Sequence, residues 1–259
     1  MIKKVQKSEE GVSYLCCGFF TGASIYSGCM ETLLELGQKF PMAAEYLSQM
    51  YLIQRDYREV SNSRLAQRLG VSRSAVTQAI KRLVNLDLVE HEGSHYELSD
   101  KGRDFATSLI TRHYLIEHLL VEVLEYPWDR ADQEASLLQD KISADFTAFL
   151  FDKLGRPTTC PHGNPFPETG DESRLLGAYD LTRVNVGTGV RILRITEEGE
   201  EVEGLLSFCY QHRIRPGKDF SIIDRKPDFV IIQAEDGEQP FSVTIHFARY
   251  LRVEILSGS

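Results

Sequence analysis

Two groups of side chains in this sequence have types and spacing suited to chemistry. Between residues 60 and 85 the charged side chains are five Arg or Lys, with no acid among them. Such a run suits contact with DNA phosphates. Farther along, His113 and Glu117 are four residues apart, a spacing that lets both reach one metal ion from one helix face. The sequence therefore offers a nucleic-acid contact and a metal contact.

The basic run predicts a surface that contacts DNA. Short polar side chains from Ser72 onward can reach phosphate oxygens or base edges, and Gln78 carries the amide that reads adenine in the major groove. An alternative is a protein-interaction module with solvated charges, but an acid-free run over two helices argues against it. The predicted DNA-contacting residues are Arg64, Ser72, Arg73, Ser74, Thr77, Gln78 and Lys81.

Short elements must hold this basic run in place. The apolar spacing over residues 42–55 predicts an amphipathic helix. Ser61–Ser63 offer N-cap chemistry for a second helix, Gly70 suits its left-handed end, and Ser72 begins a third helix. Two short strands joined by a polar turn around Gly93 follow. Helix, tight turn, helix and hairpin predict a winged helix-turn-helix.

The remaining chain predicts further helices and then a small β domain. One long helix is expected from Lys101 to about Leu124, and two more between Asp129 and Leu154. Their apolar stripe suits either a core or a homodimer face equally well. A segment rich in Pro and Gly, Leu154 to Gly177, predicts a linker, and five short apolar runs after it predict an SH3-like barrel. The expected fold class is mostly α with a small β domain.

Composition is ordinary for a globular protein, with 42% hydrophobic and 26% charged residues among 259. The net charge of −9 argues against coating nucleic acid by bulk charge. The acidity is local, however, because residues 120–180 hold 5 basic and 12 acidic residues. We find no nucleophile–base pairing, phosphate loop or HExxH spacing, so an enzyme is not expected.

The cysteines and the N-terminal segment bear on the compartment. Five cysteines without framework spacing argue against a disulfide scaffold and favour a reducing, cytoplasmic compartment. The uncharged stretch from Gly11 to Met30 superficially resembles a signal peptide, but Gly, Ser and Thr interrupt it and membrane insertion is not expected. We expect residues 1–41 to be an N-terminal extension, either disordered or the product of a start assigned before Met30 or Met42.

Four motifs stand out when taken together: Ser63–Ser72 with Val76-Thr77-Gln78, Leu98–Gly102, Arg112–Glu117 and Cys160–Pro165. With these motifs the sequence resembles the diphtheria toxin repressor family of iron- and manganese-dependent repressors. The resemblance covers about residues 43 to 256 and implies a homodimer on a palindromic operator in double-stranded DNA. It also implies a helical dimerisation domain, a C-terminal SH3-like domain of the FeoA type, and metal binding that orders the dimer for DNA.

The resemblance, with the predicted elements, sets the expected domain boundaries. After the extension, a winged helix-turn-helix spans residues 42–107, a helical dimerisation and metal-binding domain 108–155, a Pro/Gly linker 156–185, and the SH3-like domain 186–259.

The resemblance also implies two metal sites. His113, Glu117 and Asp132 fall at the family's ancillary site, with Asp132 in place of a His, and Glu201 or Glu203 would add a carboxylate from the barrel. Glu45 falls at the first-helix position of the primary site. The other primary-site positions hold Ser136, Gln139 and Asp140.

The primary set keeps mainly oxygen donors, which suit hard ions, and neutral Ser and Gln bind them weakly. Either this site binds weakly, or metal control has moved or vanished. We expect a homodimeric repressor that responds to Mn²⁺ or Fe²⁺ with an altered primary site. The alternative is a metal-independent regulator sensing another signal, through Cys209 or the N-terminal cysteines. Cys160 and His162 are expected to form a structural turn rather than a site.

Overall fold

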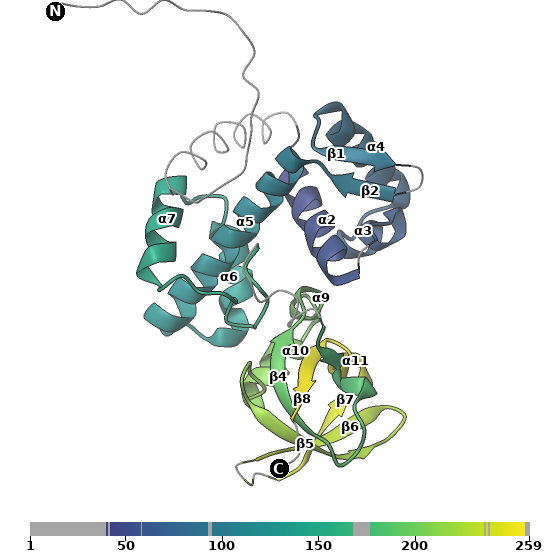
Figure 1. The fold of residues 1–259 in the computed structure, drawn as a ribbon, viewed down its shortest axis with the longest axis vertical. Coiled ribbons are helices and arrows are strands. Elements are labelled where there is room, and N and C mark those ends of the chain that lie inside the picture. The colour runs from purple at the N-terminus through teal and green to yellow at the C-terminus, as the bar shows by residue number, and fades with distance from the viewer. Residues whose placement is uncertain are drawn as a thin grey trace, which may run out of the picture.

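The computed structural model describes residues 40–256, apart from residues 41, 58, 93–94, 168–176, 236 and 238. A helical part and a β part lie at opposite ends of the molecule (Figure 1). No helix in the described part is long and apolar enough to cross a membrane. The expectations for residues 1–39, including Cys16, Cys17 and Cys29, lie outside the described residues.

The predicted winged helix-turn-helix is confirmed. Ser61 and Ser72 cap two of its helices, each side chain accepting a backbone N–H three residues on, and Ser or Thr caps of this kind stabilise a helix by about 1 kcal/mol. Between these helices Gly70 has a φ of 62°, a left-handed conformation that side chains disfavour. The elements are α2 (Ala43–Tyr57), α3 (Asn62–Arg68), α4 (Arg73–Asn85), β1 (Val89–Glu92) and β2 (His95–Leu98).

A long helix, α5 (Asp100–His118), leads from the wing into the rest of the helical part (Figure 1). The predicted helix to about Leu124 changes character at its end, because Leu119–Val123 forms a π-helical turn. Two shorter helices follow, as predicted, and they pack against α5. They are α6 (Ala131–Leu138), preceded by a 3-10 turn at Trp128–Arg130, and α7 (Ala144–Lys153).

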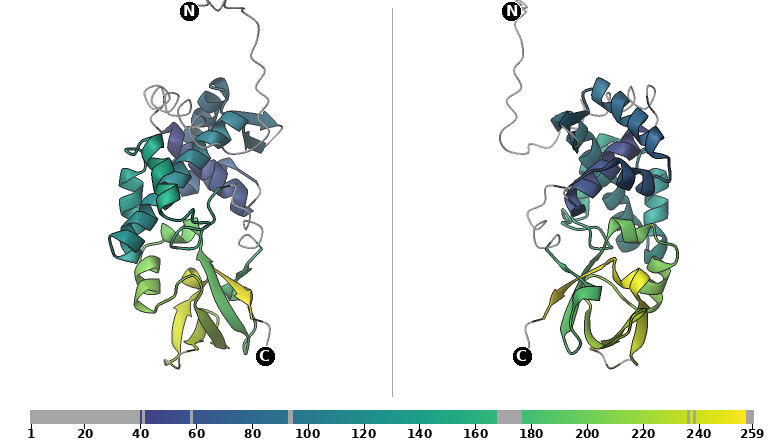
Figure 2. Two further views of the ribbon diagram at one scale, coloured as in Figure 1. Left: turned by 60° about the vertical axis from the view of Figure 1, so that its left-hand side comes forward. Right: turned by 90° about the vertical axis from the view of Figure 1, so that its right-hand side faces the viewer.

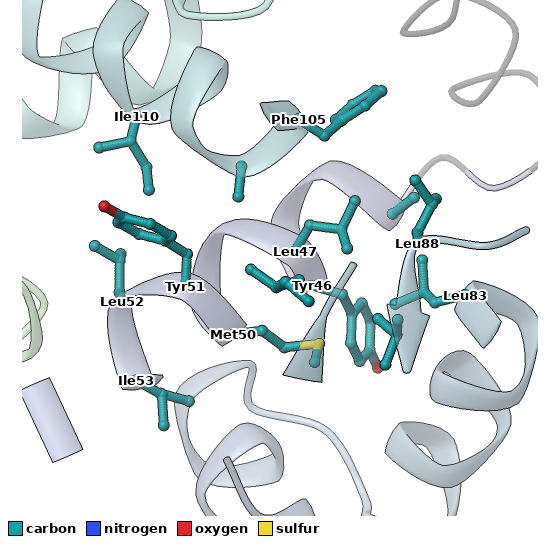
Figure 3. Close-up of a cluster of buried hydrophobic side chains, with 14 of the residues drawn as sticks. Tyr46, Leu47, Met50, Tyr51, Leu52, Ile53, Leu83, Leu88, Phe105 and Ile110 are labelled. Carbon is teal, nitrogen blue, oxygen red and sulfur yellow. The ribbon is translucent and has the colours of Figure 1, made fainter. Parts of the chain in front are cut away.

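One apolar core joins the winged helix to α5. Figure 3 shows Leu47 and Met50 of α2 in one buried cluster with Leu83 of α4 and Phe105 of α5. Leu47, Met50 and Leu83 have no exposed surface, and Phe105 is 2% exposed. Burying such a side chain contributes about 1.5–3 kcal/mol. The core therefore ties the DNA-binding elements to the helix that carries His113 and Glu117.

The predicted small β domain is confirmed, but its antiparallel sheet has six strands, not the five expected, in the order β3-β8-β4-β5-β6-β7. The additional strand, β3, lies within the segment expected to be linker, where two residues pair with β8. Figure 2 shows it curled at the end of the molecule away from the winged helix. Alternate residues such as Val230 and Ile232 point into its core. The strands are β3 (Tyr179–Asp180), β4 (Gly189–Ile195), β5 (Asp219–Arg225), β6 (Phe229–Ala234), β7 (Phe241–Thr244) and β8 (Leu251–Ile255).

Three short helices interrupt the strands and were not expected from the sequence. They are α9 (Glu197–Glu200), α10 (Leu205–Gln211) and α11 (Ile245–Ala248). The first follows β4 directly and is capped by Thr196, whose side chain accepts the N–H of Gly199. It lies where the sheet meets the helical part (Figure 1).

The start of α5 packs so closely on the wing that Gly102 tolerates no side chain. A Cβ there would lie 2.0 Å from the backbone oxygen of Leu88, which already accepts the N–H of Ser99. We expect Gly102→Ala to lower the free energy of unfolding by about 1–3 kcal/mol through overpacking. Urea unfolding measures the change. Gly189→Ala, whose Cβ would make only ordinary contacts, is the control; equal stability of the two variants would contradict this packing.

Candidate metal centre and DNA-binding surface

The helix α4 exposes most of the predicted DNA-contacting side chains. Arg73, Ser74, Gln78 and Lys81 are exposed along it, and Ser72 is exposed at its cap. Arg73 donates from Nη2 to the Ser63 hydroxyl, 2.9 Å away on α3. The predicted polar side chains thus lie along the exposed face of α4, the helix that a winged helix-turn-helix places in the major groove of DNA.

Thr77 and Arg64, also predicted to contact DNA, hold parts of the winged helix together. The Thr77 hydroxyl donates to the Arg73 carbonyl at 3.0 Å and accepts from Asn62 Nδ2 at 3.1 Å, so it joins α3 to α4. The Arg64 guanidinium lies 3.7 Å from the centroid of the Tyr57 ring. Stacking of this kind stabilises the folded chain by about 0.5–1 kcal/mol at exposed sites. Both residues therefore help to build the domain.

Three of the predicted metal ligands come together in the helical part. His113 Nε2 lies 3.6 Å from Glu117 Oε1 and 3.2 Å from Asp132 Oδ1. Glu117 has no exposed surface and His113 is 8% exposed. The ligating atoms of these three residues all lie within 4.8 Å of one another, as one ion requires. Residues on α5 and α6 thus form half of a centre.

The loop after α7 supplies the other half, which the sequence did not predict. Cys160 and His162 join Glu117 in a second group of donor atoms within 4.8 Å. His162 Nδ1 lies 3.0 Å from Glu117 Oε1 and 3.5 Å from Glu200 Oε2 of α9. The expected turn exists, since Gly163 donates to the Cys160 carbonyl. The turn also contributes donor atoms to the cluster around Glu117, and the short Cys-x-His spacing was the sequence signal for this role.

Gly163 lets this loop approach the sheet. Its φ is 92°, and a Cβ at this position would lie 2.2 Å from the Leu193 carbonyl oxygen. The loop is tied to β4 through the Ile195 N–H, which donates to the His162 carbonyl at 2.9 Å. Close backbone packing therefore brings His162 to Glu117.

Both histidines are held through their remote nitrogens. His113 Nδ1 lies 3.2 Å from Gln139 Oε1, and His162 Nε2 lies 3.1 Å from the Trp128 carbonyl. Since both partners are acceptors, each remote nitrogen donates a proton. The near nitrogens, His113 Nε2 and His162 Nδ1, are thereby aimed at carboxylates. Metal-ligating histidines are anchored in this way.

The charges of this cluster are balanced among themselves. Burial alone lowers the pKa of His113 and of His162, but the carboxylates of Glu117 and Asp132 raise both above the ordinary value. Burial raises the pKa of Glu117, and the positive charge of His162 then lowers it below its usual range. Protonated imidazoles thus compensate Glu117 when no other cation is present.

Two groups of the cluster are held neutral. Burial, together with the negative charges of Glu197 and Glu117, raises the pKa of Glu200. Burial and the charge of Glu117 raise the pKa of the Cys160 thiol. Apart from ion pairs within the cluster, the Glu117 oxygens, His162 Nδ1 and Glu200 Oε2 have no hydrogen-bond partner among the described residues. Unsatisfied acceptors in a buried pocket fit a cation, so the residues present suit a divalent metal.

The residues expected at the primary site are not gathered into a donor group. Glu45 and Ser136 are exposed, and Asp140 pairs with Lys141 at 2.7 Å on the surface. Neither Glu45 nor Asp140 belongs to a donor group among the described residues. Gln139 does reach the centre, but as the partner of His113.

The carboxylate from the barrel is also a different residue from those expected. Glu201 pairs with Arg68 and Glu203 is exposed, whereas Glu200, with its side chain 2% exposed, faces the cluster. The one-turn helix α9 determines which of these carboxylates faces the cluster. Its four residues are too few to show the apolar spacing from which the inward-facing side of a helix is predicted.

A winged helix joined through a long helix to a buried His and carboxylate cluster defines a class: DNA-binding regulators with a metal-binding helical domain. Family models narrow the class. Residues 40–95 match the N-terminal DNA-binding domain of the iron-dependent repressors, and residues 99–168 match their metal-binding and dimerisation domain.

Known relatives agree with the family models. The chain is 35% identical over 170 residues to the iron-dependent repressor IdeR of Mycobacterium tuberculosis, covering 61% of this chain and 72% of the relative. It is 30% identical over 151 residues to the diphtheria toxin repressor of Corynebacterium jeikeium, covering 58% of this chain and 62% of the relative. A solved manganese-dependent transcriptional repressor in complex with manganese superposes with a TM-score of 0.69 at 26% identity, covering 83% of this chain and 100% of that one. The chain belongs to the iron-dependent repressor family.

The proton balance of the cluster predicts how metal affinity depends on pH. A cation must displace protons from His113, His162 and Glu200, whose pKa values are all raised. We expect affinity for Mn²⁺ to increase from pH 6 to pH 8, by up to about tenfold per pH unit for each proton released. Calorimetric titration in two buffers with different ionisation heats measures the release. An affinity independent of pH would contradict this arrangement.

The raised pKa values also predict how the stability of the metal-free protein changes with pH. A histidine whose pKa is higher in the folded state contributes stability below its unfolded value, about 6.5, and loses it as pH rises through the folded value. The raised pKa of Glu200 acts in the same direction. We expect the midpoint of thermal unfolding in chelator to fall as pH increases above about 6.5. A midpoint that increases from pH 6.5 to pH 8 would show that these groups do not dominate.

Proposed function

We propose that the protein is a metal-responsive transcriptional repressor that binds a palindromic operator in double-stranded DNA as a homodimer. The observation that carries this proposal is the buried donor cluster on α5, the helix whose other end packs on the winged helix. The relatives are repressors, one named iron-dependent and one solved with manganese. Because one helix joins the metal cluster to the DNA-binding elements, the arrangement suits control of DNA binding by an ion.

The proposed ligands are the residues gathered around Glu117. His113 and Asp132 offer donors on one side of it, and Cys160 and His162 on the other. Glu200 completes the set from α9. A bound divalent cation would supply the positive charge that lets these buried carboxylates ionise together. Glu45 and Asp140, which lie apart from the cluster, are not included.

The proposed ion is Mn²⁺ or Fe²⁺. Carboxylate oxygens suit Mn²⁺, whereas imidazole and thiolate suit Fe²⁺ better than a hard ion such as Mg²⁺. The cluster contains all three kinds of donor, with Cys160 the softest. Use of the Cys160 thiolate would favour Fe²⁺. Burial raises the pKa of this thiol, and a harder ion stabilises the thiolate less, so it deprotonates Cys160 less readily.

The proposed dimer face lies on α6 and α7. Phe146 and Phe149 stack on each other with ring centroids 6.4 Å apart, and Phe149 is 59% exposed. Leu137 is 65% exposed close by in the sequence, on α6. Exposed apolar residues of this size mark interaction surfaces. Leu150 of the predicted stripe belongs to the core, whereas the family's dimerisation domain supports a homodimer face for Phe146 and Phe149.

We infer further that the protein has no enzymatic activity and works in the cytoplasm, where its DNA would be. The relatives are repressors and not enzymes, which supports the first point. The metal-independent alternative is not favoured. Cys209, the described thiol assigned to it, has no exposed surface, and burial raises its pKa to about 12. A thiol in that state is a poor sensor.

Paired variants test which residues bind metal. We expect Mn²⁺ or Fe²⁺ to raise the affinity for operator DNA of the chelated wild-type protein by at least about tenfold, within the usual range of allosteric coupling. Glu117→Gln should abolish that increase because it removes the charge that both donor groups share. Asp140→Asn should keep it. Loss of the metal effect in Asp140→Asn alone would place the sensory site at the residues expected from the resemblance.

The recognition helix is tested separately. We expect Gln78→Ala to cost about 1–3 kcal/mol of operator binding and to relax discrimination at one base pair. Arg73→Ala should weaken operator and random DNA alike and reduce the salt dependence. Fluorescence anisotropy with both DNAs at several salt concentrations measures this, with the exposed Gln211→Ala as control. A wild-type protein that binds a palindromic promoter fragment no more tightly than random DNA would refute sequence-specific binding.

A further inference from the structure

The short acidic segment Glu197–Glu201 sits between the metal cluster and the DNA-binding elements. It comprises α9 and the residue after it, and four of its five residues are Glu. A bare acidic turn on a surface would be solvated and repelled by DNA. Here each carboxylate has a partner, and the partners belong to different parts of the molecule.

One carboxylate of this segment belongs to the metal cluster. Glu200 Oε2 lies 3.5 Å from His162 Nδ1, and its other oxygen accepts a hydrogen bond from Asn164 Nδ2. Asn164 has no exposed surface, and its Oδ1 accepts from Arg194 Nη1 at 2.9 Å. Glu200 is thus held from two sides within the protein.

The other three carboxylates reach the helices around the winged helix. Glu197 accepts from the hydroxyl of Tyr114 on α5 and lies 4.0 Å from Arg55 Nη2. Glu198 accepts from the hydroxyl of Tyr57, at the last residue of α2. These contacts join α9 to α5, the helix that carries His113 and Glu117, and to the last turn of α2 in the winged helix.

Glu201 extends the same contact to α3. Its Oε1 lies 3.3 Å from Arg68 Nη2 and accepts from Gln49 Nε2 of α2 at 3.3 Å. Arg68 also donates to Gln49 Oε1 at 2.9 Å, so these three side chains form a closed set. The Arg68 side chain is 6% exposed. An ion pair with one partner this well covered is screened less by water and salt than a surface pair.

A second route runs in parallel through the sheet. Arg194 of β4, which holds Asn164, pairs with Asp56 of α2 at 3.1 Å. Asp56 also pairs with its neighbour Arg55 at 3.1 Å. The side chains of Arg55 and Arg194 are 2% and 3% exposed. A rotation of the winged helix would therefore break several buried charge contacts together, which is costly.

We propose that Glu197, Glu198 and Glu201, here called the acidic latch, are positioning residues that fix the orientation of the winged helix relative to the metal cluster. The proposal rests on the proposed function, because it makes Glu200 the connection between cluster and latch. An ion that engages Glu200 restrains α9, and α9 in turn restrains the last turn of α2 and the end of α3. In a dimer that orientation sets the spacing of the two recognition helices.

The test uses a double variant that removes two latch contacts and leaves the proposed ligands intact. Tyr57→Phe deletes the hydroxyl but keeps the ring beneath Arg64, and Glu201→Gln deletes the ion pair with Arg68. Glu235→Gln, exposed on the far turn of the sheet, is the control with the same loss of charge. Tyr57→Phe alone serves if the double variant fails to fold.

The first measurement is hydrogen exchange in chelator. We expect exchange in residues 52–57 and 62–68 of the double variant to rise at least about threefold over wild type, since these residues lose their anchor. The control should match wild type. Unchanged exchange in the double variant overturns the latch, whether or not the protein responds to metal.

The second measurement compares Mn²⁺ affinity with the metal effect on operator binding. We expect the double variant to bind Mn²⁺ within about twofold of wild type while the increase in operator affinity falls several-fold. A metal affinity that falls as much as the DNA response would assign Glu201 to the metal site and overturn the latch. A wild-type protein whose DNA binding ignores metal refutes the proposed function instead, and the exchange result then decides the latch by itself.

Discussion

The buried carboxylate of Glu117 sets the constraint that the surrounding structure satisfies. It has no exposed surface, and among the described residues its oxygens pair only with His113 and His162, so its charge needs a cation close by. His113 approaches it from one turn earlier on α5, and His162 from the loop after α7. A hydrogen-bond acceptor at the remote nitrogen orients each imidazole ring. Two protonated imidazoles meet that need, and a divalent ion in their place would meet it as well. A site with two ways to neutralise one charge is suited to sensing.

The same constraint explains why three parts of the chain meet at one place. Glu117 comes from the long helix, His162 from the proline-containing loop, and Glu200 from the β domain. None of these parts closes the cluster alone, so its charge balance depends on their docking. The ion pairs Arg194–Asp56 and Glu201–Arg68 join the β domain, which supplies Glu200, to the helices of the winged helix. Arg194 also holds Asn164, which donates to Glu200. Changes in cluster charge are therefore placed next to the contacts that hold the DNA-binding elements.

The residues that the resemblance assigns to a primary metal site take other roles in this structure. Gln139 is neutral and, instead of joining a donor group, accepts from His113. A neutral amide orients the ring without adding another negative charge to a pocket that already holds Glu117, Asp132 and Glu200. Asp140 points to Lys141 at the surface. The chemistry expected at two sites is thus concentrated at one.

The sequence by itself determined the winged helix, the long helix, five of the six strands of the β domain and the pair His113 and Glu117, because each follows from local periodicity, capping or spacing. The motifs also sufficed for the family. Only the tertiary structure decided that Cys160 and His162 face Glu117, and that Glu200 rather than Glu201 turns toward them. These contacts join residues far apart in the chain, and they depend on Gly163 packing against β4 and on the register of a one-turn helix. The Cys-x-His spacing signals two donors in one turn, but no local pattern tells which partner they face, because that depends on how separate elements dock.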